Sequence, residues 1–146
     1  MKYEKSCGAV VFTRDGGAVK YVIVEELVGK YHGFPKGHVE RNETELETAR
    51  REISEEVSLD VQFIEGFRTD DEYFIYGGTV RKHVTYFLAE YTGQTPVFQK
   101  SELKSVVVVP FEEAMLLFEH DNTKRILTEA NDYLRKLEVQ KATPLN

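Results

Sequence analysis

The sequence predicts a single α/β (α+β) domain in which helices are interspersed among the strands of a mixed β-sheet. Two observations predict this class. Short apolar runs bounded by turn residues, typical of strands, dominate the middle of the chain, and other segments repeat apolar residues every three or four positions, as helices do. The 146 residues are enough to bury one core. We expect the domain to span residues 1–137, with a short C-terminal tail over residues 138–146.

The expected strands follow from local patterns. The first spans residues 6–13 and leads into the turn Asp15-Gly16-Gly17, which is typical of a hairpin, and the second follows at residues 21–24. Gly and Pro residues indicate a loop over residues 29–37. Further strands are expected at residues 61–67, 83–91 and 105–109.

Helices are expected in three places. Apolar residues at spacings of three and four predict a helix from about Glu43 to Val57, with Leu46, Ala49, Ile53 and Val57 on its core face. Pro110 and the four residues after it open a short helix. Asn122 or Thr123 is placed to cap a final helix that runs to about Leu137, with a core face of Ile126, Leu127, Ala130 and Leu134.

Composition excludes several classes of protein. Hydrophobic residues make up 41% of the chain and charged residues 30%, which excludes a disordered chain, collagen and a coiled coil. No apolar run approaches the roughly 18 residues that a spanning helix needs. Residues 1–5 lack an apolar signal region, and the single cysteine, Cys7, cannot form an internal disulfide. We therefore expect a cytoplasmic protein without membrane attachment.

The charge balance bears on the partner. A net charge of −6, from 19 basic and 25 acidic residues, disfavours binding to DNA or RNA, which requires a basic face. A small anionic substrate is compatible with this charge, because a divalent cation can reverse the local field of an acidic cleft. A metal-dependent enzyme and a simple binding domain both fit this composition.

Three glutamates give the first indication of chemistry. Glu52, Glu55 and Glu56 occupy positions i, i+3 and i+4 of the expected helix, so their side chains share one flank. Carboxylates this close repel one another, and a hard cation such as Mg²⁺ or Mn²⁺ would compensate them. The alternative is a solvated acidic face paired with Arg50 and Arg51, which for these three glutamates alone is the commoner case.

The wider spacing favours the metal site. Gly37 is followed after five residues by Glu43 and, after seven more, by Arg51-Glu52, an aliphatic Ile53, the Glu55-Glu56 pair and a final aliphatic Leu59. This segment resembles the Nudix box, G-x5-E-x7-R-E-U-x-E-E-x-G-U, where U is aliphatic. One fixed position departs: Ser58 replaces a glycine that ends the helix in a left-handed turn, at a cost on the order of 1 kcal/mol.

The resemblance implies the Nudix fold, a mixed β-sheet sandwiched between α-helices, and hydrolysis of nucleoside diphosphate derivatives by attack of water on a phosphorus. It implies that Glu52 and Glu56 are the main metal ligands, with Glu55 as a further ligand or neighbour and the backbone carbonyl of Gly37 beside them. Arg51 and Glu43 would pair and brace the loop and the helix. The implied cofactor is Mg²⁺, or Mn²⁺ in its place.

Segments outside the box extend the resemblance over about residues 6–135. They are similar to the asymmetric diadenosine tetraphosphate hydrolases, at residues 34–40, 46–49, 64–67, Tyr73 and 86–90. This likeness implies that Lys36, His38 and Lys82 face the polyphosphate. It further implies that Tyr73 and Tyr133 hold an adenine, and that Glu102 completes the metal shell or acts as the base. A surface or core role is the alternative for each.

Three functions follow in order of preference. The first is a Mg²⁺-dependent pyrophosphohydrolase that converts diadenosine tetraphosphate to ATP and AMP. The second is a Nudix hydrolase of another substrate: a nucleoside triphosphate, an ADP-ribose-like compound or an RNA 5′ end. The third is a Nudix-fold binding domain without turnover, which the retained Glu52, Glu55 and Glu56 disfavour. In each case the expected partner is a small nucleotide, and the protein is a monomer or homodimer.

Overall fold

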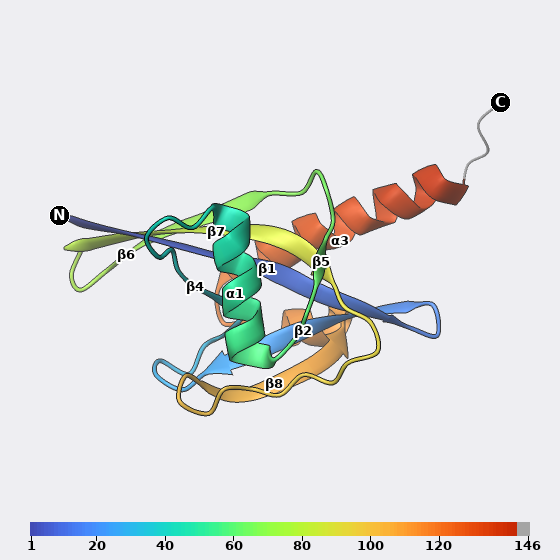
Figure 1. Ribbon diagram of the computed structural model, residues 1–146, viewed down its shortest axis with the longest axis horizontal. Coiled ribbons are helices and arrows are strands. Elements are labelled where there is room, and N and C mark those ends of the chain that lie inside the picture. The colour runs from blue at the N-terminus through green and yellow to red at the C-terminus, as the bar shows by residue number, and fades with distance from the viewer. Residues whose placement is uncertain (143–146) are drawn as a thin grey trace.

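A computed structural model of the protein describes residues 1–142, which form one eight-stranded sheet and three helices (Figure 1). The strands are β1 (Lys2–Asp15), β2 (Ala18–Glu26), β3 (His32–Gly33), β4 (Lys36–His38), β5 (Gln62–Phe63), β6 (Thr69–Ile75), β7 (Val80–Glu90) and β8 (Leu103–Pro110). The helices are α1 (Glu45–Val57), α2 (Phe111–Leu117) and α3 (Asp121–Ala142).

Strand β1 organises the sheet, because different parts of it pair with different strands. It runs parallel to β7 along most of its length, and this parallel pair makes the sheet mixed, as predicted. Its C-terminal part, residues 12–15, pairs with β2 in an antiparallel hairpin, while Ser6–Gly8 pair antiparallel with β4. A Cβ at Gly8 would lie 2.0 Å from the carbonyl oxygen of Pro35, so only glycine allows β4 to approach β1 this closely.

The core has two halves on opposite faces of the sheet. Residues alternate along β1, so Val10 and Phe12 contribute to one cluster and Ala9 and Val11 to the other. The first cluster is covered by α2 and α3, and the second by the buried face of α1. Figure 1 shows α1 in front of the strands and α3 behind them. The expected sheet between helices is therefore confirmed.

The strand predictions were wrong in three places. The expected loop at residues 29–37 contains the short strand β3 and the start of β4. The expected strand at residues 61–67 shrinks to β5, two residues long, and the following β6 was missed. Strand β6 pairs only with β7, and its residues alternate between exposed and partly or fully buried. Its polar start, Asp70-Asp71-Glu72, hides that alternation in the sequence. Asp70 points its carboxylate at β7, where it accepts a hydrogen bond from the Thr85 hydroxyl at 2.7 Å.

The helix predictions need three corrections. Helix α1 starts at Glu45 behind an N-cap at Thr44, not at Glu43, and its exposed Leu46 is replaced on the core face by Thr48. Helix α3 starts at Asp121 and continues to Ala142, so residues 138–142 are helical and not part of a tail; residues 143–146 lie outside the described residues. Ser58 caps α1 with φ 58°, the left-handed conformation for which the family pattern has glycine. No helix within residues 1–142 is long and apolar enough to cross a membrane.

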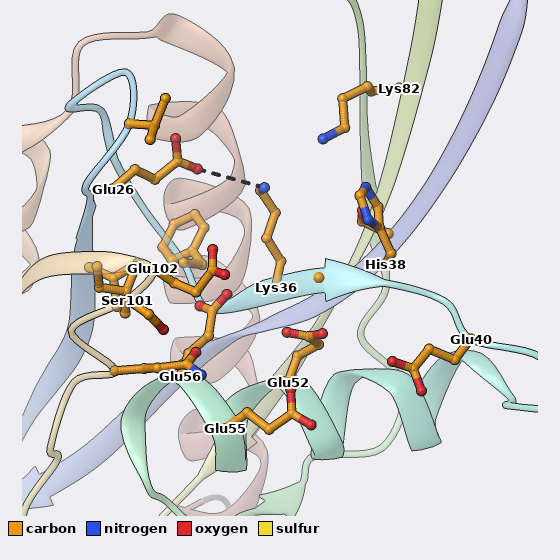
Figure 2. Close-up of a pocket in the computed structure, with 17 residues that line it drawn as sticks. Glu26, Lys36, His38, Glu40, Glu52, Glu55, Glu56, Lys82, Ser101 and Glu102 are labelled. Atoms are coloured by element: carbon orange, nitrogen blue, oxygen red, sulfur yellow. Dashed lines mark ion pairs between the residues drawn. The ribbon is translucent and has the colours of Figure 1, made fainter.

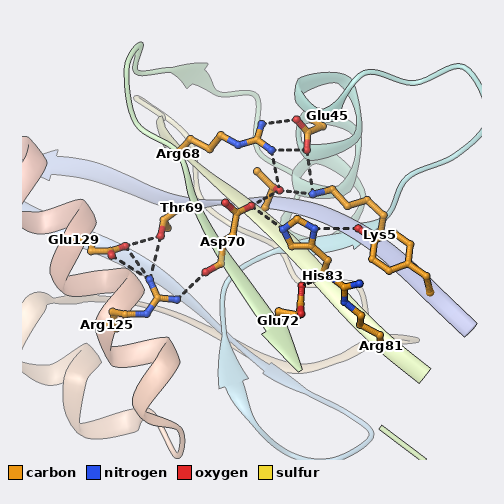
Figure 3. Close-up of polar contacts among 12 residues, drawn as sticks. Lys5, Glu45, Arg68, Thr69, Asp70, Glu72, Arg81, His83, Arg125 and Glu129 are labelled. Carbon is orange, nitrogen blue, oxygen red and sulfur yellow. Dashed lines mark hydrogen bonds and ion pairs between the residues drawn. The ribbon is translucent and has the colours of Figure 1, made fainter. Parts of the chain in front are cut away.

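A polar cluster fixes the start of α1 on the sheet (Figure 3). The guanidinium of Arg68 donates to both carboxylate oxygens of Glu45, and the ammonium of Lys5 lies 3.1 Å from the same carboxylate. Hydrogen bonds from Arg68 hold the pKa of Glu45 down, at about 2, so the carboxylate stays ionised. These contacts join the first turn of α1 to β1 and to the segment before β6. They therefore fix the orientation of α1, and with it the side of the sheet on which its acidic flank (Glu52, Glu55 and Glu56) lies.

Candidate active site

A pocket of about 480 Å³ lies over the acidic flank of α1. Helix α1 contributes Glu52, Glu55 and Glu56, and the loop before β8 contributes Glu102. That loop is anchored on α1, because the Gln99 N–H donates to the carbonyl of Glu56 at 2.8 Å. The opposite side consists of Lys36, Gly37 and His38 from β4 and Lys82 from β7. We refer to this cavity, with carboxylates on one side and cations on the other (Figure 2), as the phosphate pocket.

Gly37 allows the Glu52 side chain to pass close over its backbone at the edge of the phosphate pocket. A Cβ at position 37 would lie 2.0 Å from the carboxyl carbon of Glu52 and 2.2 Å from one of its oxygens. Any side chain at this position would displace the carboxylate. The first fixed glycine of the motif therefore has a steric cause, which is the passage of the Glu52 side chain over its backbone.

Arg51 braces the loop before α1. Its guanidinium donates two hydrogen bonds to the carboxylate of Glu43, at 2.6 and 3.0 Å, and one to the backbone carbonyl of His38 at 2.9 Å. It also reaches Glu52 at 2.9 Å and Glu55 at 3.2 Å. The hydrogen bonds from Arg51 hold the pKa of Glu43 down, at about 2. The Arg51 guanidinium thus links the loop before α1 to Glu52 and Glu55 of the acidic flank.

Glu52 and Glu56 are short of positive charge. Burial raises the pKa of Glu56 to about 8, and its neighbour Glu52 raises it further, although Lys36 opposes the shift. Burial also raises the pKa of Glu52, against the effect of Arg51. Both shifts have the sign expected when burial of neighbouring carboxylates outweighs the effect of the cations near them. The site is therefore suited to bind one.

The donor set fits a hard divalent cation. Carboxylate oxygens from α1 and the backbone oxygen of Gly37 are the ligand types that Mg²⁺ and Mn²⁺ prefer. As the side chains stand, no three acidic, histidine or cysteine groups within residues 1–142 are already grouped as a metal site. Glu52 and Glu55 are instead hydrogen-bonded to Arg51. Metal binding would require these two side chains to turn from Arg51 toward the pocket.

The cationic side of the phosphate pocket involves two acids that the sequence did not reveal. The ammonium of Lys36 lies 3.7 Å from the carboxylate of Glu26. The carboxylate of Glu4 lies 3.3 Å from His38 and 3.9 Å from Lys82. Burial lowers the pKa of Lys82, and the nearby charge of Lys36 lowers it further. The two lysines therefore favour an anion between them.

A second pocket, of about 610 Å³, adjoins the first. Its aromatic walls come from segments far apart in the sequence, and it shares Lys36 with the phosphate pocket. We call it the aromatic pocket; its rings belong to Tyr31, His32, Phe34, Tyr73, Phe74, Tyr86 and His120. The rings of Tyr31 and His120 lie 4.5 Å apart between centroids. A planar base fits such a lining.

The structure brings Tyr73 into the aromatic pocket but not Tyr133. The Tyr133 ring packs against Phe67, and its hydroxyl donates to the backbone carbonyl of Glu65 at 2.6 Å. The other aromatic wall is formed by Tyr31 and His120, which sequence reasoning missed. Neither residue lies in a motif, and they meet only because the loop before β3 lies beside the start of α3.

Comparison with known proteins finds chains that are similar in sequence and in fold. The family model described as NUDIX domain matches residues 2–130. The bis(5′-nucleosyl)-tetraphosphatase [asymmetrical] of Sus scrofa is 31% identical over 141 residues, which cover 89% of this chain and 95% of the relative. The crystal structure of a C. elegans Ap4A hydrolase binary complex superposes with a TM-score of 0.84 at 21% identity, covering 91% of this chain and 98% of that one. The NUDIX domain of Shewanella oneidensis NrtR complexed with ADP ribose gives 0.74 at 15% identity, with 92% and 90% covered.

Proposed function

Because the chain belongs to the Nudix hydrolase family and is a pyrophosphohydrolase acting on phosphoanhydride bonds, we propose that it hydrolyses a dinucleoside polyphosphate with the help of Mg²⁺. The proposed substrate is diadenosine tetraphosphate, and the products are ATP and AMP. The asymmetrical tetraphosphatases of pig, mouse and rat, which are 29–31% identical to this chain, support the choice of substrate.

The observation that supports this substrate best is the union of two pockets with different chemistry. The aromatic pocket suits a nucleoside, whereas the phosphate pocket offers Lys36 and Lys82 to a chain of phosphates above the carboxylates of α1. A substrate that fills both must have a base at one end and a polyphosphate running away from it. The second nucleoside would then lie toward the open side of the phosphate pocket.

The chemistry follows from this placement. A water molecule attacks one phosphorus of the chain, the bridging P–O bond on the far side breaks, and the departing phosphate takes the bonding electrons. The proton released by the water passes to a carboxylate. Three candidates line the pocket, which are Glu52, Glu55 and Glu102. Glu52 and Glu56, with Glu55 beside them, would hold the divalent cation, which would supply positive charge to offset the negative charge that develops on the phosphates. Lys36 and Lys82 hold the remaining phosphates in line.

A substrate panel tests this proposal. Diadenosine tetraphosphate, ATP, ADP-ribose and a 5′-triphosphorylated RNA are compared by kcat/KM in Mg²⁺, with products separated by chromatography. We expect diadenosine tetraphosphate to give the highest kcat/KM, with ATP and AMP in equal amounts. In ¹⁸O water, the label in AMP or in ATP identifies the phosphorus attacked. A higher kcat/KM for another substrate, or formation of two ADP molecules, would overturn the assignment.

A further inference from the structure

Glu26 lies where the two pockets meet. Four side chains line both the phosphate pocket and the aromatic pocket, and they are those of Val24, Glu26, Phe34 and Lys36. Among these four, only the Glu26 carboxylate can accept a hydrogen bond, since valine and phenylalanine are apolar and a lysine ammonium only donates. Figure 2 shows the Glu26 carboxylate facing the Lys36 ammonium across the opening.

The backbone at Glu26 is fixed on both sides. Its N–H donates to the carbonyl of Tyr31 at 2.9 Å, and the next N–H, of Leu27, donates to the carbonyl of Glu102 at 3.1 Å. The pairing of β2 with β8 shifts register between Glu25 and Glu26, an irregularity that often occurs beside active sites and redirects a side chain. The end of β2 is therefore held against both neighbouring loops.

The carboxylate of Glu26 itself is free to accept hydrogen bonds. The Lys36 ammonium lies 3.7 Å from it, which is beyond hydrogen-bonding distance. In the part of the chain that the structure describes, no side chain or backbone N–H donates to this carboxylate. The side chain is 42% exposed, so an incoming ligand can reach it.

We propose that Glu26 binds the ribose hydroxyls of the nucleoside in the aromatic pocket and selects ribonucleotides over deoxyribonucleotides. This inference rests on the proposed function. With the base in one pocket and the phosphates in the other, the ribose that joins them must lie at their shared boundary. Ribose hydroxyls donate and the Glu26 carboxylate accepts, which gives a charge-assisted hydrogen bond. The charge of Lys36 beside it offsets repulsion between this carboxylate and the phosphates.

The test combines a change in the protein with a change in the ligand. Wild type, Glu26→Ala and Glu25→Ala are assayed with diadenosine tetraphosphate and with its symmetric 2′-deoxy and 3′-deoxy analogues. Glu25 is the matched control: it is the preceding carboxylate, it lines neither pocket, and it accepts a hydrogen bond from Ser105 at 3.1 Å. Wild type should prefer the ribose substrate over at least one analogue by roughly tenfold in kcat/KM, mainly through KM. Glu26→Ala should reduce that preference to about one, and Glu25→Ala should keep it.

Two outcomes would overturn the inference. One is a wild-type enzyme that treats the ribose and deoxyribose substrates alike. The other is a Glu26→Ala variant that changes kcat/KM equally for all three substrates, as expected if Glu26 only restrains Lys36. Melting curves of all variants, and partial retention of the preference in Glu26→Gln, guard against a general loss of structure.

A binding measurement separates this inference from the proposed function. Calorimetric titration with AMP, 2′-deoxy-AMP and 3′-deoxy-AMP needs no turnover of diadenosine tetraphosphate. If that compound is a poor substrate but AMP binding still shows a preference that depends on Glu26, the proposed function fails and the inference holds. If the compound is cleaved efficiently without any such preference, the proposed function holds and the inference fails.

Discussion

The carboxylate of Glu52 lies directly over the α-carbon of Gly37, where a Cβ would come within 2.0 Å of the carboxyl carbon. Two fixed positions of the motif, fifteen residues apart, therefore constrain each other sterically. The Glu52 side chain is 15% exposed and is held from the other side by Arg51, so a Cβ at position 37 would force its carboxylate out of this position. This contact leads to the first prediction.

Gly37→Ala should lower kcat/KM by about a hundredfold, because a methyl group at this position displaces a carboxylate of the active site by an ångström or more. Steady-state kinetics with diadenosine tetraphosphate measure the effect. Gly33→Ala is the matched control, since a Cβ at Gly33 meets nothing within 4 Å; because Gly33 lines the aromatic pocket, the two variants are compared by kcat. Equal activity in the two variants would show that the Gly37 contact is unimportant.

Glu56→Gln should nearly abolish turnover while leaving the fold intact. The amide keeps the shape of the side chain but removes the charge that would hold a cation. In EDTA at pH 9, where the wild-type carboxylate is ionised above its raised pKa of about 8, the variant should melt no lower than wild type. Near-normal kcat at saturating Mg²⁺ would contradict the role of Glu56.

Arg51→Ala should lower both the melting temperature, by several degrees, and the rate. The substitution leaves Glu43 without its two hydrogen bonds and frees Glu52 and Glu55 from their shared partner. The melting temperature and the rate of Arg51→Lys should lie between those of wild type and Arg51→Ala, because a lysine ammonium cannot donate two parallel hydrogen bonds as the planar guanidinium does. Thermal melting and kinetics are compared with Arg41→Ala, an exposed arginine of the preceding turn. An unchanged melting temperature would remove the bracing role.

Acid should destabilise the protein partly through Glu45. The folded-state pKa of this carboxyl, about 2, lies below its ordinary value of 4.5, mainly because Arg68 donates to it. Its contribution to stability is therefore present above pH 4.5 and is lost as the pH falls toward 2. Between pH 5 and pH 3, wild type should lose more stability in urea titrations than Glu45→Gln does. Glu113→Gln, at an exposed position of α2, should follow wild type.

The two tyrosines predicted to hold a base should behave differently. Tyr73→Ala should raise KM about fivefold or more, because Tyr73 lines the aromatic pocket and stacking is worth roughly 1–3 kcal/mol per base. Tyr73→Phe should restore most of the binding, since the ring makes the contact. Tyr133→Ala should instead lower the melting temperature, because it removes the packing on Phe67 and the hydrogen bond to Glu65.

Steady-state kinetics and melting curves of the three variants decide this point. A raised KM in Tyr133→Ala, with an unchanged melting temperature, would show that Tyr133 does contact the base. A Tyr73→Ala variant with normal KM would show that the aromatic pocket does not hold the base during turnover.

The local features of this protein could be predicted from the sequence because neighbouring residues alone create them. The periodicity of α1 places Glu52, Glu55 and Glu56 on one flank wherever that helix lies. The hairpin between β1 and β2 likewise depends on one turn, at Asp15-Gly16-Gly17. The family pattern could be recognised for the same reason, and the sheet between helices was what that resemblance implied. Strand β6 could not, because its polar start gains hydrogen-bond partners only when β7 lies beside it.

Tertiary structure alone decided which residues gather around the two pockets beside the acidic flank of α1. Glu4 meets Lys82 because β1 and β7 run parallel, a pairing of residues almost eighty positions apart that no local pattern encodes. The same holds for Tyr31 and His120, which form the aromatic wall that had been assigned to Tyr133. The sequence determined the family, the helix and its carboxylates, since their spacing is short and periodic. The walls of both pockets depend on long-range contacts, between paired strands in one case and between a loop and the start of a helix in the other, which only the folded chain supplies.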